Sequence, residues 1–309
     1  MQMLVRKSLF LMVVVVIALA VPFATNGYSQ YVINLILVYV AIGIGFNILL
    51  GYAGQFAFAS AAFMGIGAYT TAILSSTVGV PFWLCIPLAG VVTTIVGVAC
   101  AVPALRVVSI YLALVTFAFA ELMVWVFLNW KSLTHGANGI GVASPELMGY
   151  PLGGDTNIYY LLLPCVAMSF WASVRIIRSA VGRSFVMVRE SEIVAKCNGI
   201  NVAGTKMVAF GLSAFFGGLG GAFFAYVVGF ILPSSFGLSQ LVIHIAVVVI
   251  GGMGSLVGPV IGAVILTVVP EVLRDFQSLQ EILFGATLIL VPIFVPKGGA
   301  GLLVKVGLL

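Results

Sequence analysis

The chain is a succession of long apolar runs that contain almost no charge. Of its 309 residues, 62% are hydrophobic and 7% are charged, whereas an ordinary soluble domain carries about 25% charged residues. So few ionic groups cannot supply the polar exterior that a soluble fold needs. Because a span needs roughly 20 apolar residues, the chain is predicted to be an all-α polytopic membrane protein with about nine or ten transmembrane helices. The runs lie near 8–24, 31–50, 56–77, 81–104, 107–128, 158–177, 208–231, 239–272 and 281–296.

The run 239–272 is too long for one ordinary span and carries four residues, Gly251-Gly252-Met253-Gly254, near its centre. This pattern predicts two short segments or a broken helix rather than one straight rod. Residues 51–74 and 251–269 resemble each other, since each is a glycine-rich break followed by a helix of small residues. Paired interrupted segments mark the transport path in many transporters. Shared helix-packing chemistry gives the same pattern, so both interpretations stay open.

The basic residues set the expected orientation, because cytoplasmic loops are enriched in Lys and Arg. Arg6 and Lys7 place the N-terminus in the cytoplasm, and Arg106 marks a second cytoplasmic turn. The loop 129–157 holds Lys131 as its only Lys or Arg and is expected on the periplasmic side. Six of the 13 basic residues lie in one connection, which is therefore expected in the cytoplasm: Arg175, Arg178, Arg183, Arg189, Lys196 and Lys206.

The two ends of the chain carry further signals. The first run also resembles a secretory signal with a cleavage site at 18–20, but it continues through Phe23 and many spans follow. We therefore expect an uncleaved first span. Lys297 and Lys305 favour a cytoplasmic C-terminus, which requires the run 239–272 to cross the membrane twice.

A few polar side chains fall inside the apolar runs, namely Asn34, Asn47, Gln55, Ser60, Glu121 and His244. A carboxyl group in hydrocarbon is costly and should face protein or water. Glu121 therefore lies either beside a solute path or in a hydrogen bond that ties two helices together, and we favour the second. His244 has no second ligand nearby in sequence, which favours an interhelical histidine. Candidates for the translocation path are Asn47, Gln55, Ser60, Glu121 and His244.

Small residues and cysteines indicate packing rather than chemistry. Two glycine rows at helical spacing are expected to let helices approach closely: Gly217 with Gly221, and Gly254 with Gly258 and Gly262. The cysteines have no metal-ligand spacing, so neither a disulfide framework nor a metal site is expected: Cys85, Cys100, Cys165 and Cys197. No basic stripe with interleaved aromatics indicates nucleic-acid binding. No Gly-Lys dipeptide occurs, so the sequence has no phosphate-binding P-loop.

The stretch 178–206 is predicted to form a short amphipathic helix. Glu192 and Lys196 are spaced for an i,i+4 ion pair, and Gly199 is placed to end the helix in a left-handed cap. An apolar stripe is expected at Val186, Ile193 and Cys197. Such a helix could present a compact surface to a soluble partner, or the segment could be an ordinary basic loop. Physical reasoning leaves both open.

Five segments together resemble a known family. They are RSAVGRSFVMVRESEIVAKCNGINVAGTK at 178–206, GYAGQFAFASAAFMGIGAYTTAIL at 51–74, IYLALVTFAFAEL at 110–122, LTHGANGIGV at 133–142 and LVIHIAVVVIGGMGSLVGPVIGAVILTVVPEVLR at 241–274. In this order they resemble the M-type permease subunits of bacterial ABC importers for branched-chain amino acids. The resemblance extends over most of the chain from Gly43 to Arg274.

The resemblance implies one permease domain over 1–309 in the bacterial inner membrane, with a type II-like importer architecture. It implies a heterodimer with a second, homologous permease, two cytoplasmic ATPases that bind ATP and Mg, and a periplasmic substrate-binding protein. On this basis the chain is a transport subunit rather than an enzyme and holds no cofactor. FAFAS at 56–60 has fewer polar residues than the family usually shows, so urea, short amides and other amino acids remain alternative substrates.

The family also implies roles for particular residues in 178–206. This loop is expected to dock into a cleft on the ATPase, with Val194 standing where alanine is common. The residues implied in coupling are Arg189, Glu190, Glu192, Ala195 and Gly199. A competing class, the ion-coupled secondary transporter, is poorly supported, because proton relay needs several titratable groups at membrane depth and only Glu121 and His244 qualify.

Overall fold

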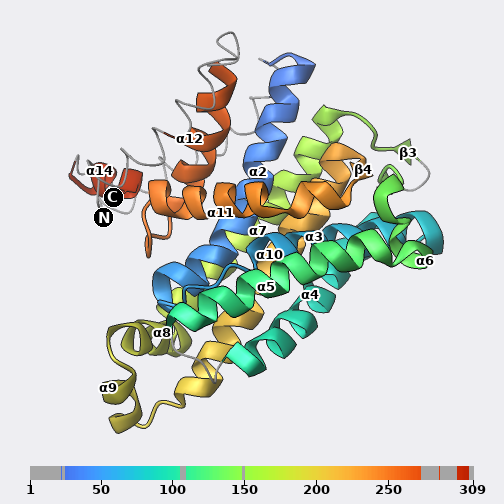
Figure 1. Cartoon of the computed structure of the whole chain (residues 1–309). Helices are drawn as coiled ribbons and strands as arrows, with labels where there is room; N and C mark the ends of the chain where they lie inside the picture. The colour runs from blue at the N-terminus through green and yellow to red at the C-terminus, as the bar shows by residue number, and fades with distance from the viewer. Residues whose placement is uncertain are drawn as a thin grey trace.

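The computed structural model describes residues 22, 25–104, 109–147, 150–272, 285 and 298–305. Within these ranges seven helices are long and apolar enough to cross a membrane, which confirms the predicted all-α polytopic architecture (Figure 1). They are Gly27–Tyr52, Ser60–Val78, Phe82–Pro103, Tyr111–Asn129, Asp155–Arg178, Val202–Val228 and Pro233–Gly251. The expected spans 8–24 and 281–296 fall outside the described residues, apart from isolated positions, as do Arg6, Lys7, Arg106 and Lys297.

Two of the long spans end in wider, π-type turns. Helix α2 (Gly27–Asn47) continues into η1 (Ile48–Tyr52), and α3 (Ser60–Ile73) continues into η2 (Leu74–Val78). The other spans are built on α4 (Phe82–Ala104), α5 (Ser109–Asn129), α7 (Asp155–Arg178), α10 (Val202–Val228) and α11 (Leu238–Gly251). A short helix, α14 (Gly298–Lys305), follows near the end of the chain.

Helix α10 lies at the centre of the bundle and packs against α4, α3 and α2. Its glycines permit this approach. A Cβ at Gly221 would collide with the backbone of Met64 in α3, and one at Gly217 would meet the Phe63 side chain. The predicted packing row is therefore confirmed for these two positions. Since lipid gives helices no hydrophobic drive to associate, such close backbone contact is what holds them together.

The long run 239–272 is broken, as its glycines predict. Helix α11 ends at Gly251, residues 252–257 are not helical, and α12 spans Gly258–Val272. Gly258 and Gly262 pack against α11, whereas Gly254 lies in the break with a positive φ of 73°. The predicted three-membered helical row is thus wrong for Gly254, because the helix begins only at Gly258.

Helix α12 returns towards the start of α2. The Tyr28 hydroxyl donates a hydrogen bond of 2.6 Å to Oε2 of Glu271, near the end of α12. The run 239–272 therefore reverses direction at its break, and α12 returns along α2. Two crossings of the membrane require such a reversal.

The two long connections lie at opposite ends of the bundle (Figure 1). The connection 178–206 forms α8 (Ala180–Glu190) and α9 (Glu192–Cys197) at one end. The loop 129–157 lies at the other end, with η4 (Pro233–Phe236) beside it. It contains α6 (Lys131–Thr134), η3 (Gly136–Asn138), β1 (Ile140–Gly141), β2 (Glu146–Leu147) and β3 (Tyr150–Pro151). This arrangement fits the prediction that the two connections face opposite sides of the membrane.

Two short antiparallel ladders, which the sequence patterns did not predict, fix this second end. Strand β1 pairs with β4 (Phe230–Ile231), and β2 pairs with β3. The first ladder joins the loop after α5 to the residues after α10, and the Val142 N–H extends it by donating to the Gly229 carbonyl at 2.9 Å.

Replacing Gly221 with Val should destabilise the bundle, because the new side chain enters the backbone of α3. Overpacking of a well-packed interior costs about 1–3 kcal/mol, so we expect a lower thermal midpoint for the detergent-solubilised protein. Gly141→Ala is the matched control, since nothing lies within 4 Å of a Cβ added there. Equal midpoints for Gly221→Val and the unmodified protein would contradict the packing described.

Candidate functional site

Of the two breaks that resemble each other in sequence, the second packs against η1, the turn that leads into the first. The first break is residues 53–59, between η1 and α3, and the second is residues 252–257, between α11 and α12. Asn47 at the end of α2 holds the second break, because its Nδ2 donates to the Ser255 carbonyl at 2.8 Å and its Oδ1 accepts from the Gly254 N–H at 2.9 Å. Both ends of this buried amide are used, so the second break is fixed to α2.

Gly51 lets the chain segments approach closely at this point. A Cβ there would collide with the Asn47 side chain and with the backbone of Gly254. We call the group formed by Asn47, Gly51, Gly54, Arg189, Gly254 and Ser255 the break junction.

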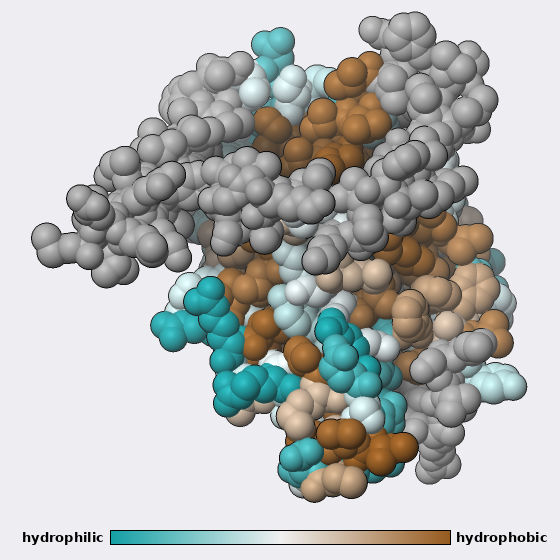
Figure 2. All heavy atoms as spheres, turned by 90° about the vertical axis from the view of Figure 1, so that its left-hand side faces the viewer, coloured by the Kyte–Doolittle hydropathy of each residue, from teal (hydrophilic) through white to brown (hydrophobic). Residues whose placement is uncertain are grey.

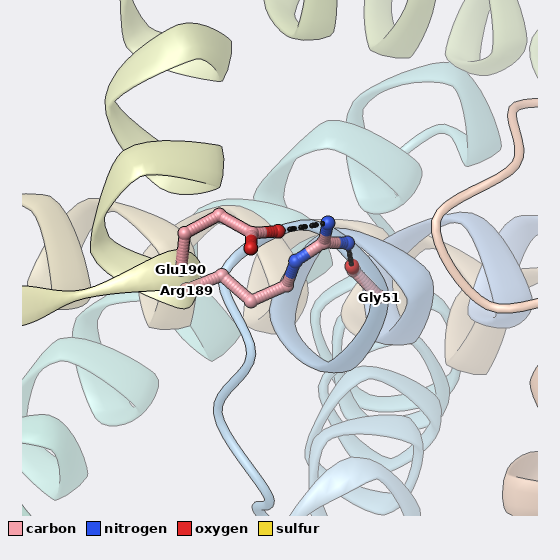
Figure 3. Close-up of polar contacts among 3 residues, drawn as sticks. All are labelled: Gly51, Arg189 and Glu190. Atoms are coloured by element: carbon pink, nitrogen blue, oxygen red, sulfur yellow. Dashed lines mark hydrogen bonds and ion pairs between the residues drawn. The ribbon is translucent and has the colours of Figure 1, made fainter.

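Arg189, in the last turn of α8, connects the break junction to the connection 178–206 (Figure 3). Its Nη1 donates to the Gly51 carbonyl at 2.7 Å, and its Nη2 forms an ion pair of 2.8 Å with Oε1 of Glu190. The last carbonyls of a helix lack intrahelical partners and attract positive charge. The guanidinium group therefore satisfies the end of η1.

Arg189 also lies against both breaks. A Cβ on Gly54, which has a positive φ of 65°, would lie 3.1 Å from Cβ of Arg189. A Cβ on Gly254 would lie 3.3 Å from its Nη1. The Arg189 side chain thus packs against Gly54 in the first break and Gly254 in the second. A large movement of α8 would therefore disturb both breaks.

The connection 178–206 folds into two capped helices instead of the single helix that its pattern predicts. Ser191 is extended, with φ −164° and ψ 117°, and its hydroxyl accepts from the Val194 N–H at 3.3 Å to begin α9. Ser179 caps α8 and Asn201 caps α10 in the same way. We call α8 and α9 together the knob.

Gly199 ends α9 in a left-handed conformation, with φ 77°. The Ile200 N–H donates to the Ala195 carbonyl and the Gly199 N–H to the Lys196 carbonyl, both at 3.0 Å. This pair of bonds is the Schellman motif, which favours glycine at the left-handed position. The predicted cap is confirmed.

Two expected side-chain features of the knob are wrong. Glu192 pairs with Lys206 of α10 at 2.6 Å instead of with Lys196, because the split at Ser191 turns α9 towards the start of α10. The predicted stripe does not pack against the bundle either, since Val186 is half-buried while Ile193 and Cys197 are exposed.

The buried contact of α9 is Ala195, which packs with Val188 of α8 and Val202 of α10. The neighbouring Ile193 and Val194 are 76% and 54% exposed. Figure 2 shows an apolar patch bordered by hydrophilic side chains at the lower end of the molecule, the end where Figure 1 places α9. The knob therefore exposes the apolar side chains of Ile193 and Val194, while Ala195 packs it against α10.

A second polar group lies in the interior around His244 of α11. The His244 side chain is buried, with Nδ1 3.2 Å from the Ser60 hydroxyl and Nε2 3.1 Å from Nε2 of Gln240. Because an amide nitrogen can only donate, this orientation of Gln240 makes Nε2 of His244 the acceptor and Nδ1–H the donor to Ser60. Gln240 also donates to the Tyr39 hydroxyl at 3.5 Å. The predicted interhelical role of His244 fits these contacts, which join α11 to α3 and α2.

The other two candidates for a translocation path, Gln55 and Glu121, and the polar residue Asn34 make no contact with the His244 group in the described structure. Gln55 is buried and its Nε2 donates to the Ala53 carbonyl within the first break. Asn34 is buried and donates to the Asp155 carbonyl at the start of α7. Glu121 lies on an exposed face of α5, so the expected hydrogen bond to another helix of this chain is absent among the described residues. Among the described residues, no three His, Cys, Asp or Glu side chains lie together in a group that could bind a metal ion.

The chain is similar to known transport permeases over most of its length. A family model described as "Branched-chain amino acid transport system / permease component" matches residues 28–292. The high-affinity branched-chain amino acid transport system permease protein LivM of Salmonella typhimurium is 33% identical over 95% of this chain and 75% of its own length. LivM of Escherichia coli is 32% identical over the same shares.

A more distant match is the autoinducer 2 import system permease protein LsrC of Shigella flexneri. It is 31% identical over 44% of this chain and 40% of its own length. No solved structure matches the chain significantly.

Arg189→Ala should loosen the break junction. Hydrogen bonds to charged groups contribute roughly 1.5–3 kcal/mol, so we expect amide hydrogen exchange in residues 51–55 to become faster by about tenfold or more. Glu190→Ala is the control, because Glu190 is exposed and surface ion pairs contribute about 1 kcal/mol or less. If both variants exchange at the unmodified rate, Arg189 does not hold the breaks.

Proposed function

Because the chain belongs to the branched-chain amino acid transport permease family, we propose that it is the membrane-spanning subunit of an ATP-driven importer that carries branched-chain amino acids across the bacterial inner membrane. The family match covers residues 28–292, and the two LivM relatives align with 95% of the chain. As a multi-pass transport subunit, it needs an energy source that its own sequence does not provide, since it has no P-loop.

The observation that carries the coupling mechanism is the contact between the knob and the two breaks. Ile193 and Val194 form an exposed apolar tip on a capped, anchored helix pair, and such a patch bordered by polar residues is typical of a protein–protein contact. We assign this tip to docking with the ATPase. Arg189 then links the docked knob to Gly51 and Gly254.

A cycle of alternating access follows from this linkage. ATP binding closes the paired ATPases, the docked knob shifts, and Arg189 changes its position against the first break. Asn47 holds the second break to α2, and α2 continues through η1 into the first break. In this mechanism the two breaks therefore move together. In other transporters interrupted helices line the substrate site, and one bundle rocks or gates against the other around it.

The full assembly contains, in this proposal, two cytoplasmic ATPases with their ATP and Mg, a second homologous permease and a periplasmic substrate-binding protein. The knob faces the cytoplasm and the loop 129–157 faces the periplasm, with both termini in the cytoplasm. The substrate assignment rests on the names of the two LivM relatives. Urea, short amides and other amino acids are the alternatives, and the binding protein selects among them.

Co-purification tests the class of transporter. A tagged chain extracted from native membranes should bring down ATPase subunits and a second permease, and uptake in vesicles should require ATP. A chain that is isolated alone and moves amino acids along an ion gradient would instead be a secondary carrier.

Gly199→Val should uncouple ATP hydrolysis from uptake. A β-branched residue in the left-handed region costs roughly 1–2 kcal/mol, so α9 should lose its ordered end and the tip its orientation. Gly199→Asn is the matched control, because Asn tolerates that conformation. We expect uptake per ATP hydrolysed to fall in the Val variant and to stay near the unmodified level in the Asn variant. Normal coupling in a correctly inserted Val variant would show that docking does not use α9.

A further inference from the structure

A recess runs between α4 and α7, with α10 as its floor. Helices α4 and α7 both contact α10, but they do not pack closely against each other. The space between them measures about 720 Å³. We call this recess the α4–α7 groove. Its walls include Trp83 and Pro87 of α4 and Met168 and Ile176 of α7, and its floor includes Leu212 and Phe215 of α10.

The groove lies at the depth of the hydrocarbon. Its α7 residues extend from Asn157 to Ile176, which is roughly 28 Å at the rise of an α-helix and close to the ~30 Å thickness of the hydrocarbon core. The wall residues Trp83, Tyr160 and Met168 are exposed. The groove is therefore open at the surface of the bundle, on the side that faces the membrane.

The lining of the groove suits a hydrocarbon chain better than a polar solute. Among the described residues that line it, none carries a charged group. The Ser169 hydroxyl donates to the Cys165 carbonyl at 2.8 Å, and Nδ2 of Asn157 donates to the Gly153 carbonyl at 3.2 Å. These polar groups already have partners within α7. An amino acid has two charged groups that need partners when they leave water, and this lining provides none.

Another membrane helix fits the groove poorly. Helices associate in lipid through small residues that let their backbones approach, as Gly217 and Gly221 do between α10 and α3. The walls of the groove carry the bulky side chains of Trp83, Tyr160 and Met168 instead. A flexible acyl chain enters between such side chains, because it needs no close approach of two backbones.

Positive charge gathers at one end of the groove. Trp171 and Arg175 follow Met168 at intervals of three and four residues on α7, and the Arg175 guanidinium lies 5.2 Å from the centre of the Trp171 ring. Trp at the end of an apolar face is typical of the membrane–water interface. Arg183 of α8 donates from Nη1 to the Arg178 carbonyl at 3.4 Å, which brings it to the same end of α7. We call Arg175, Arg178 and Arg183 the basic end.

The basic end is not neutralised by the rest of the described chain. All three arginines are exposed. The ion pairs among the described residues join Arg189 to Glu190 and Lys206 to Glu192, and neither pair uses the basic end. A hollow of about 380 Å³ lies between α8, which carries Arg183, and the first turns of α10. This end of the bundle therefore offers positive charge and room for an anionic group.

We propose that the α4–α7 groove and the basic end together bind an anionic phospholipid of the cytoplasmic leaflet, with an acyl chain in the groove and the phosphate at the three arginines. Basic pockets between membrane helices on the cytoplasmic side recognise such headgroups. The leaflet follows from the orientation that the basic residues indicate. The site itself depends neither on the transported substrate nor on the importer assignment.

Native mass spectrometry tests the site on the chain purified with its accompanying subunits and stripped of lipid by detergent. The protein is titrated with phosphatidylglycerol and, in parallel, with phosphatidylcholine. We expect the first phosphatidylglycerol to bind about tenfold or more tightly than phosphatidylcholine, because each arginine near the phosphate contributes about fivefold. The preference should weaken at high salt, which screens exposed charges. Equal affinities for the two lipids would overturn the proposal.

Ala172→Phe tests the groove, because Ala172 lies in its lining and a phenyl ring there occupies the recess. Displacing about two CH₂ groups of an acyl chain corresponds to roughly a tenfold loss of phosphatidylglycerol affinity. Ala167→Phe is the matched control, since Ala167 is exposed on the same helix outside the lining, and it should change nothing. Unchanged affinity in the Ala172→Phe variant would show that protein or another lipid site takes the place proposed here, and would refute it.

Arg178→Gln and Arg183→Gln test the basic end. Each should lower phosphatidylglycerol affinity by about fivefold and leave phosphatidylcholine affinity as it is. Lys131→Gln, at the opposite end of the bundle, is the control and should change neither. Because both arginines are exposed, these variants keep the fold and remain decisive even where Ala172→Phe fails to fold. Equal effects on the two lipids, or no effect on phosphatidylglycerol, would place the phosphate elsewhere and refute the site.

Discussion

Inside a bilayer every backbone N–H and C=O must find its partner within the protein, since lipid offers none. Regular helices meet this requirement by themselves, but the breaks at 53–59 and 252–257 do not. Here side chains from elsewhere supply the bonds: Asn47 to Gly254 and Ser255, Thr116 to Phe58, and Arg189 to Gly51. The rest of the architecture depends on these few contacts, because they allow irregular backbone to exist within the bundle.

In the proposed mechanism, this dependence lets a movement outside the membrane reach its interior. Two of the three side chains that support the breaks belong to membrane helices, but Arg189 belongs to α8, in the connection 178–206. The end of η1, which Arg189 bonds, and Gly54 in the first break, which it contacts, therefore both depend on where α8 lies. Ala195 and the Glu192–Lys206 ion pair hold α9 against α8 and α10, so a partner that displaces α9 also displaces α8. Coupling of this kind needs no chain of intermediate contacts, because the Arg189 guanidinium reaches directly from α8 to η1.

The parts of this structure that the sequence predicted are those decided by local pattern. Apolar length located the spans, glycine clusters located both breaks, and Gly199 marked the end of α9, since each depends on neighbouring residues. The split at Ser191, the Glu192–Lys206 pair and the Arg189–Gly51 bond, whose residues are 138 positions apart, depend on how distant segments meet. No periodicity encodes them. The Gln240–His244 contact was detectable, because the two residues are four apart on one helix.

Glu121 and His244 have different environments in the described residues. Both are titratable groups within a span, and hydrocarbon makes the same demand of each. The fold answers that demand for His244 with Ser60, Gln240 and a fully enclosed position. For Glu121 the described residues provide no such partner, and the side chain is exposed on α5. The carboxyl group of Glu121 therefore has to be covered by protein or water outside the described residues.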